Sequence, residues 1–588
     1  MKKTIKIFFL TLLVFCGVIL KRDNVLAEDF YVGFGQGGDG SGISCETAKP
    51  YEFFNDNSNC GTGDGKISSG DTVFLCDDTG EFTETLVTPY SCNGFTIKSA
   101  LGETPLFDVA LGNALNFPNI GKSNIVIDGL TFSGWEDGKS AIYFVDAVGP
   151  IEIKNSKFTK SDAEIASYAV NFYIEDGAGG AVGNVDIHDN EFFLNSKVEG
   201  IRMGIFTSST MARVHDVNVH HNKFSNVDKA FRFFMSTEAQ SWVPAQGLRP
   251  YNIKFDDNEV HTSNAAAVGT AAGITEISGT SSVSRNIITD CGSPDQIRVN
   301  CLQLHWVDGV DIVDNVINGV DTATCDGDGI ILDWTISNDA YISTNNNVLR
   351  NRISNANALC GGRCISIFKG SGNLVANNFC NGTSADGLKI GSNEGAGNIF
   401  YNNTVTDVVN CFSLSDGDNI GVPESIWKNN ICSQATGYGF KVINNSIVPT
   451  ESHNLFYDIG LNDIVLDGSD LIHDPKLFPD GTLESDSPAI DAGTDVGFLY
   501  SGNAPDIGAF EYTSENESCS DNIQNQDETG IDCGGVCEAC VVPITYGLSN
   551  FISAITNWLG IGNETSDVNS DGVVNTRDLG VVMSNWGN

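Results

Sequence analysis

Basic residues and prolines are scarce in this chain of 588 residues. It has 32 Lys and Arg against 75 Asp and Glu, for a formal net charge of -43 at pH 7. Phosphate binding needs a basic surface, so this balance argues against nucleic acid and anionic membrane surfaces as partners. The 15 Pro stand against 64 Gly. That ratio suits tight turns and strands, because Gly adopts left-handed backbone and Pro removes a hydrogen-bond donor from a sheet. The 41% hydrophobic residues exclude wholesale disorder.

Long apolar runs are lacking as well. The run from Ile7 to Leu20 is too short for a membrane span, so we expect no membrane-spanning segment. The run follows two lysines and precedes a cleavage site that ends at Ala27. This arrangement predicts a signal peptide over residues 1–27 and a secreted, extracellular protein. A lipoprotein that uses Cys16 is the alternative, although bulky Phe15 precedes that cysteine.

The cysteine count points in the same direction. Of 17 cysteines, Cys16 leaves with the signal peptide, and the remaining 16 are an even number. In a secreted chain this favours disulfides, with buried free thiols as the alternative. Connectivity cannot be deduced from sequence. The candidate local pairs are Cys45 with Cys60, Cys76 with Cys92, Cys291 with Cys301, and Cys411 with Cys432.

A short phrase recurs through the middle of the chain. Alternating apolar residues lead to an Asn, and a large apolar residue follows shortly after it, as in Ile151-Glu152-Ile153-Lys154-Asn155 followed by Phe158. Successive phrases are 24 to 36 residues apart. The repeated asparagines are Asn155, Asn190, Asn222, Asn258, Asn286, Asn315, Asn351, Asn378, Asn403, Asn430 and Asn454.

These phrases predict a solenoid. Period-two alternation indicates a strand with one buried face, and a spacing that varies by whole loops around a fixed strand indicates stacked coils. Eleven coils at about 4.8 Å each give a rod on the order of 50 Å long. We expect the repeated Asn in the turn after each strand, because Asn tolerates left-handed backbone and its stacked side chains can form a hydrogen-bonded ladder.

On these phrases, residues 120–460 resemble the right-handed parallel β-helix superfamily that includes pectate lyases. The resemblance implies an all-β fold: a right-handed, single-stranded parallel β-helix of about 11 coils. The superfamily hosts lyases, hydrolases, epimerases and adhesins, so the fold implies no single activity. We assign residues 28–120 to an N-terminal cap and first coils, 121–460 to the repeats, and 461–512 to a C-terminal cap. The cap rests on Ser487–Gly493 and Asp506–Glu511, which look like closing phrases of secreted β-helix proteins.

Two further segments follow. Residues 513–545 form a linker with four cysteines from Cys519 to Cys540, which fit either a zinc site or two disulfides. Residues 546–588 carry oxygen side chains at positions 1, 3, 5, 9 and 12 of a loop with Gly572 at position 6, a pattern typical of calcium loops. The predicted calcium ligands are Asp567, Asn569, Asp571, Val573 through its carbonyl, Asn575 and Asp578.

This last segment resembles the second repeat of a type I dockerin. The resemblance implies a small α-helical calcium-binding module that docks to a cohesin-like or cell-surface protein. Phe551–Trp558 resembles a dockerin helix, yet no first calcium loop precedes it. That departure puts cohesin binding in doubt and leaves a calcium-stiffened tail as the alternative.

Chemistry on a solenoid would use the outward residues of stacked strands. Alignment of the strands that open three coils places His305 above Asp333, one coil apart, with Lys369 and Lys389 nearby. We predict these four residues as the catalytic set. The predicted substrate-binding residues are Arg202, Arg232, Gln303, Trp306 and Trp334.

A His–carboxylate pair is an oriented general base, Lys or Arg neutralises a uronate carboxylate, and Trp faces hold sugar rings. This set suits β-elimination on an acidic polysaccharide. Hydrolysis is the second choice, because it needs two carboxylates and this face offers only Asp333 and Glu276. A calcium ion in the substrate groove is an additional expectation, although no spacing singles out its ligands.

The alternative is a non-catalytic protein. A His–Asp neighbour pair arises by chance among many outward polar residues. The chain also lacks the adjacent aspartates with Gly-His-Gly of polygalacturonases and the Arg-x-Pro-x-x-Arg of the large pectate lyase family. An adhesin-like surface or matrix protein that binds glycans along the rod fits these absences.

Overall fold

A computed structural model describes residues 27–513, except residues 36, 78–79, 120, 176–181, 196, 207–213, 237–248, 262–269, 276, 292–299, 323–326, 334–341, 359–360, 392–394, 416–420 and 444–445. The predicted signal peptide apart from Ala27, the Cys-rich linker beyond residue 513 and the predicted calcium module therefore lie outside the described residues. The chain divides into two units, Met1–Tyr512 and Thr513–Asn588.

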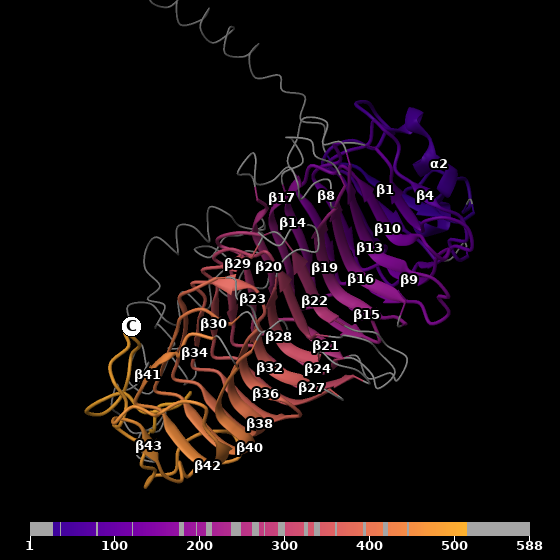
Figure 1. Cartoon of the computed structure of the whole chain (residues 1–588). Helices are drawn as coiled ribbons and strands as arrows, with labels where there is room; N and C mark the ends of the chain where they lie inside the picture. The colour runs from indigo at the N-terminus through magenta and orange to yellow at the C-terminus, as the bar shows by residue number, and fades with distance from the viewer. Residues whose placement is uncertain are drawn as a thin grey trace, which may run out of the picture. The chain divides into compact units, whose positions relative to one another are not determined.

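The first unit is a parallel β-solenoid, as the repeats predict. Its strands stack coil upon coil from the indigo end at β1 to the orange end at β42 (Figure 1). Every ladder pairing between the named strands is parallel, and a full coil in the middle of the solenoid contributes strands to three ladders, here called faces A, B and C. Parallel pairing needs a crossover, and the rest of each coil supplies it.

Face A is the 16-stranded sheet. Its strands are β1 (Asp29–Gly33), β2 (Lys49–Pro50), β3 (Thr72–Leu75), β5 (Thr96–Ser99), β8 (Ile125–Asp128), β11 (Ile151–Lys154), β14 (Val182–His188), β17 (Val214–His220), β20 (Tyr251–Asp256), β23 (Ser282–Ser284), β26 (Asp311–Val313), β30 (Asn347–Leu349), β34 (Leu374–Ala376), β37 (Asn398–Tyr401), β39 (Ser425–Lys428) and β41 (Thr450–Ser452). A separate pair joins β29 (Ser343–Thr344) to β33 (Gly370–Ser371).

Face B follows the asparagine turn in each coil. Its strands are β6 (Leu106–Asp108), β9 (Thr131–Gly134), β12 (Lys157–Thr159), β15 (Glu191–Phe193), β18 (Lys223–Ser225), β21 (Glu259–His261), β24 (Ile287–Cys291), β27 (Val316–Thr322), β31 (Arg352–Ala358), β35 (Phe379–Thr383), β38 (Thr404–Leu414), β40 (Ile431–Val442), β42 (Leu455–Leu461) and β43 (Leu471–Ile472).

Face C completes each coil. Its strands are β4 (Leu86–Val87), β7 (Leu115–Phe117), β10 (Ser140–Val145), β13 (Ser167–Ile174), β16 (Val198–Ile205), β19 (Lys229–Met235), β22 (Thr270–Thr275), β25 (Leu302–His305), β28 (Gly327–Asp333), β32 (Gly362–Ile367) and β36 (Asp386–Ile390), continued by the second halves of β38 and β40.

The core is a column of like side chains in register. On face B, Phe107, Phe132, Phe158 and Phe192 stack with ring centroids 4.7 to 5.0 Å apart. This distance matches the spacing of neighbouring strands, so an aromatic residue at the same point of successive coils stacks on its neighbour without adjustment.

The asparagine ladder is confirmed from Asn190 to Asn454. Each amide nitrogen donates to the side-chain oxygen of the next coil's Asn, as in Asn286 to Asn315 at 2.9 Å. The left-handed residue, however, is the one before each Asn: Asp257 and Arg285 have φ of 57° and 53°. In the coil of β11, Asn155 is itself the left-handed residue, and the backbone N–H of Ser156 enters the ladder by donating to Asn190. The ladder side chain is buried, and its amide accepts a hydrogen bond from the Asn of one neighbouring coil and donates one to the Asn of the other.

Removing one ladder side chain should destabilise the solenoid. Asn286 is fully buried, donates to Phe255 and Asn315, and accepts from the backbone and side chain of Asn258. We expect Asn286→Ala to lower the free energy of unfolding by about 2–4 kcal/mol, because buried partners lose their hydrogen bonds. Chemical denaturation measures the change. Asn347 is partly exposed, and Asn347→Ala, which loses one bond to Asp311, is the matched control and should cost less than about 1 kcal/mol.

Two of the four local cysteine pairings predicted from sequence are wrong. Disulfides join Cys45 to Cys76 and Cys60 to Cys92, not Cys45 to Cys60 and Cys76 to Cys92. Separations of 31 and 32 residues are about one coil, so each bridge links neighbouring coils. Cys291–Cys301 and Cys411–Cys432 are confirmed. Cys364 and Cys380 are buried free thiols.

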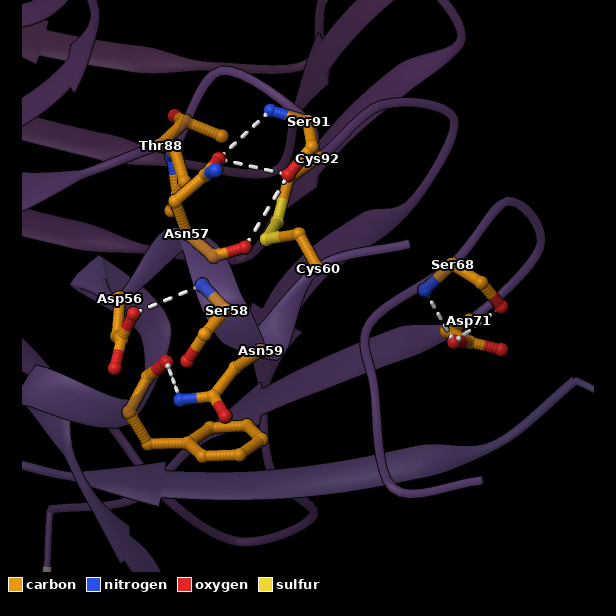
Figure 2. The surroundings of a disulfide bond; sticks show 12 residues. Asp56, Asn57, Ser58, Asn59, Cys60, Ser68, Asp71, Thr88, Ser91 and Cys92 are labelled. Carbon is orange, nitrogen blue, oxygen red and sulfur yellow. Dashed lines mark hydrogen bonds between the residues drawn. A yellow bond between two sulfur atoms is a disulfide. The ribbon is translucent and has the colours of Figure 1, made fainter. Parts of the chain in front are cut away.

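The Cys60–Cys92 bridge sits in a hydrogen-bonded N-terminal region. Figure 2 shows Ser91 beside Asn57, whose side-chain oxygen accepts from the Ser91 hydroxyl at 2.7 Å. Nearby, the 3₁₀ turns η1 (Cys45–Thr47) and η2 (Asn57–Asn59) flank helix α2 (Tyr51–Asn55). Phe54 of α2 is buried and packs edge-on against Phe95 at 5.9 Å, so this helix covers core side chains of the first coils.

The C-terminal end of the solenoid is closed by residues that follow β42. Ile464 and Leu466 pack against the main core, and the Asp470 carboxylate accepts from the backbone of Asn454, the last ladder residue, at 2.7 Å. A carboxylate has no N–H to donate onward, so it can end the ladder. Burial, with a smaller contribution from Asp470, raises the pKa of Glu451 to about 8.

Residues 473–512, here called the return segment, run back along face B. Gly508 donates to the backbone of Asn429, Ala509 donates to Thr404, and Phe510 lies under the Arg352 guanidinium at 4.3 Å. The segment covers apolar outward side chains of face B: Phe379 contacts Phe510, and Ile431 and Leu455 pack with Leu483, Ala489 and Ile507. Of the predicted cap, residues 461–472 therefore close the end of the rod, while the rest shields its side. Among the described residues, no helix is long and apolar enough to cross a membrane.

Candidate functional site

Face C carries most of the residues predicted to bind or act on a substrate. One outward column, here called the central column, runs in continuous register through eleven coils. Its members are Tyr143, Asn171, Arg202, Arg232, Gly273, Gln303, Ile331, Ser366, Lys389, Ser413 and Lys441.

A recurring phrase places acidic residues beside this column. Glu199-Gly200-Ile201, Asp328-Gly329-Ile330 and Asp386-Gly387-Leu388 each open a face C strand. A Cβ on Gly387 would meet a methyl carbon of Val405 at 2.3 Å, and one on Gly200 would meet the Ala230 carbonyl oxygen at 2.8 Å. Only Gly lets the backbone approach the core this closely, so each phrase holds its carboxylate at the edge of the face.

The first cluster of charges centres on Glu199. Its carboxylate is 2.7 Å from Arg232 Nη1 and 3.8 Å from Arg202 Nε, with a side chain that is 4% exposed. The Arg202 guanidinium also lies 4.4 Å from the Tyr168 ring and 5.1 Å from the Phe234 ring. Two guanidinium groups share one buried carboxylate, so the cluster keeps excess positive charge on aromatic faces.

A second carboxyl group adjoins this cluster. Burial, opposed by the charge of Lys229 and aided by Glu199, raises the pKa of Asp228. The Asp228 carboxylate is itself paired with Lys229 at 3.1 Å.

The second cluster lies in later coils. Arg363 Nη1 is 3.3 Å from Asp328, Arg363 Nε is 3.8 Å from Asp386, and Lys389 Nζ is 3.8 Å from Asp386. Asn410 adds a hydrogen bond of 2.8 Å to Asp386. Burial, with the charge of Arg363 as the next cause, lowers the pKa of Lys389. Its ammonium therefore releases a proton more readily than an exposed lysine does.

His305 and Asp333 lie between the two clusters, in register on neighbouring strands β25 and β28. Both side chains are partly exposed. The alternation of β25 points Leu302 and Leu304 into the core and Gln303 and His305 outward, as the alignment predicts.

Other predicted residues have different places. Trp306 is 4% exposed and belongs to the core, so the expectation that it offers an outward sugar platform is wrong. Its φ of 52° turns the chain at the corner after β25, and its ring packs under Arg249 at 4.3 Å. Lys369 follows β32 by two residues and is partly exposed. Trp334 and Glu276 lie outside the described residues.

No protein-family model and no curated protein matches this sequence. Similar solved structures include AlyGC, a PL6 family alginate lyase, at 13% identity and a TM-score of 0.43 over 72% of this chain and 53% of that chain. A GH136 lacto-N-biosidase from Eubacterium ramulus matches at 13% identity and a TM-score of 0.38, over 75% and 68%. Pectate lyase Pel9A matches at 13% identity and a TM-score of 0.22, over 83% and 98%. At such identities and scores, function has to be inferred from the residues of face C.

Distance along the rod separates the predicted residues. Arg202 and Lys389 are six coils apart in the central column, about 29 Å at the usual strand spacing. Lys389 is three coils, or about 14 Å, beyond His305. A single sugar cannot contact all of them, so together they suit successive units of a polymer.

Sequence reasoning missed Glu199, Asp328, Arg363 and Asp386. The recurring acidic–Gly–aliphatic phrase marks three of them and could have been found. Arg363 stands in the same register, between Asp328 and Asp386, but without that phrase. The described residues contain no group of three or more His, Cys, Asp or Glu placed to hold a metal ion.

Proposed function

We propose that this protein is a secreted lyase that cleaves an acidic polysaccharide bound along face C. One observation carries the proposal. In a chain with 32 basic and 75 acidic residues, one register column gathers Arg202, Arg232, Lys389 and Lys441, with the His305–Asp333 pair beside it. A line of cations along stacked strands matches a polymer that repeats a carboxylate along its length.

The chemistry is β-elimination. His305, oriented by Asp333, accepts the proton on the carbon next to the uronate carboxylate. The electrons of that C–H bond form a carbon–carbon double bond, and the bond to the glycosidic oxygen breaks. The leaving oxygen takes a proton from an acid. Lys369, in the coil after Asp333, neutralises the carboxylate whose negative charge grows as the proton leaves. Arg202, Arg232, Gln303 and Lys389 bind neighbouring sugars.

A test of the activity needs a panel of uronate polymers: polygalacturonate, alginate and a glucuronate-containing polymer. A lyase produces an unsaturated sugar whose absorbance rises with time, whereas a hydrolase releases reducing ends without it. Rising absorbance with one polymer supports the proposal. Reducing ends without absorbance would instead support hydrolysis, with Asp333 as one of its two carboxylates.

A glycan-binding protein without catalysis is the second candidate. The ion pairs of Glu199 with Arg232 and of Asp328 with Arg363 favour it, because they occupy charges that a substrate would otherwise engage. Retention of a uronate polymer on the protein, with no product by either assay, would select this function.

The C-terminal segment adds a proposed docking function. Asp567, Asn569, Asp571, Val573, Asn575 and Asp578 would hold one Ca²⁺, and the ordered loop would present the adjoining helical pattern to a cohesin-like or cell-surface partner. We also propose that a calcium ion can bridge substrate and face C.

Calcium titration of the full-length protein checks the loop. We expect a calorimetric binding event that disappears in Asp571→Ala, because this change removes the ligand at loop position 5. Asp521→Ala, a change of the same type in the linker, should retain it. An identical heat in wild type and Asp571→Ala would contradict the assignment.

A further inference from the structure

Face B carries a second column of hydrogen-bonding side chains that the proposed lyase chemistry does not use. Its last six positions are held in register across successive strands from β27 to β42. They are Asn318, Ser354, Asn381, Thr406, Ser433 and Tyr457. Each coil thus presents an amide or hydroxyl group about 4.8 Å from the next.

The end of this column lines a groove. Asn381, Thr406, Ser433 and Tyr457 form one wall of a hollow of about 440 Å³, and the return segment, including Phe478, forms the other. A second hollow of about 530 Å³ shares Asp407 and Gln434 with the first, so the two adjoin each other. From Asn381 to Tyr457 the wall spans three coil rises, about 14 Å.

Polar and aromatic groups in this groove are available to a ligand. Among the described residues, none hydrogen-bonds the side chain of Asn381 or Tyr457. Thr406 and Ser433 bond each other at 2.9 Å and so hold a fixed orientation. Tyr457 is 37% exposed and Phe478 is 51% exposed. Exposed aromatic faces beside amide and hydroxyl groups suit a sugar, which has apolar ring faces and hydroxyl edges.

The charge of the groove sets the class of sugar. Neither hollow has a lysine or arginine among its described lining residues, while Asp407, Asp458 and Asp474 contribute carboxylates. A uronate chain would be repelled here, in contrast to the cationic central column of face C. We infer that this groove is a second, non-catalytic site that binds a neutral oligosaccharide, separate from the acidic polymer proposed for face C.

Calorimetry on the full-length protein tests the inference. The probes are hexamers of β-1,4-linked glucose, xylose and mannose, with a galacturonate hexamer as the charged comparison. We expect at least one neutral hexamer to bind with one site per chain and more tightly than the galacturonate hexamer at this site. Tyr457→Ala should weaken that binding roughly tenfold or more, because the exposed ring face is lost. Asn381→Ala should weaken it by a smaller factor.

Two control variants separate this site from others. Phe193→Ala removes a 55% exposed aromatic side chain from face B, outside the groove, and should leave neutral-sugar binding unchanged. Arg232→Ala on face C should also leave it unchanged, so failure of the lyase proposal would not affect the result. No binding of any neutral hexamer would overturn the inference. So would equal affinity for wild type, Tyr457→Ala and Asn381→Ala, or tighter binding of the galacturonate hexamer in the groove.

Discussion

Replacing His305 with Ala is expected to reduce kcat/KM for uronate cleavage by about 10²–10⁴-fold, the range typical for loss of a general base. The mutation removes the imidazole that lies in register with Asp333, while Leu302 and Leu304 of the same strand keep their core positions. KM should change little, because the cations of the central column still hold the polymer. Initial rates of the absorbance increase, measured over a range of polymer concentrations, give both constants.

His261 offers a matched control for this change. It is exposed on face B, lies 3.7 Å from Asp290 and hydrogen-bonds Thr289, so it is another histidine beside a carboxylate. His261→Ala should retain full activity. Asp333→Asn should lower kcat with little effect on KM, since the amide keeps the shape but not the charge that orients and stabilises the imidazolium. Full activity in His305→Ala would remove His305 from the mechanism.

The fold could be predicted from sequence because successive coils repeat the same strand pattern and the same asparagine turn. Period-two alternation marks a strand, and an Asn at a fixed point marks the turn, so eleven weak signals support one another. The asparagine turn shows where prediction from local sequence fails. The left-handed backbone position is occupied by Asp257, Arg285 or His221, so its residue type differs from coil to coil. The Asn repeats because its side chain belongs to the hydrogen-bonded ladder, and not because its own φ is positive. Local propensity alone pointed to the wrong residue.

The site was predictable only where it follows the alternation. That pattern placed Arg202, Arg232 and Lys389 in one outward column and paired His305 with Asp333. It also placed Lys369 with these cations, but Ser366 holds that position of the column and Lys369 lies two residues beyond the end of β32. Alternation ends at a corner, and there prediction failed: Trp306, one residue beyond β25, turns into the core. Two predicted disulfide pairings were wrong for a related reason. Cys45 and Cys60 are close in sequence, but a solenoid brings together residues one coil apart, so Cys45 meets Cys76.

Arg363 should contribute strongly to the stability of face C. Its guanidinium lies between Asp328, which is 0% exposed, and Asp386, which is 6% exposed. Arg363→Ala would leave two buried carboxylates without the cation that bridges them, and breaking a buried pair in this way costs about 3–5 kcal/mol. We expect that decrease in the free energy of unfolding, measured by guanidinium denaturation with the disulfides intact.

The size of this effect depends on burial, and a surface ion pair provides the comparison. Arg350 makes two hydrogen bonds of 2.8 Å to Asp314, yet its side chain is 52% exposed, so Arg350→Ala should cost less than about 1 kcal/mol. The double variant Arg363→Met with Asp328→Leu should regain part of the loss, because it removes charge of both signs and restores apolar volume. Equal losses for Arg363→Ala and Arg350→Ala would mean that water reaches the cluster. In that case the lowered pKa of Lys389, whose main cause is burial, would not hold either.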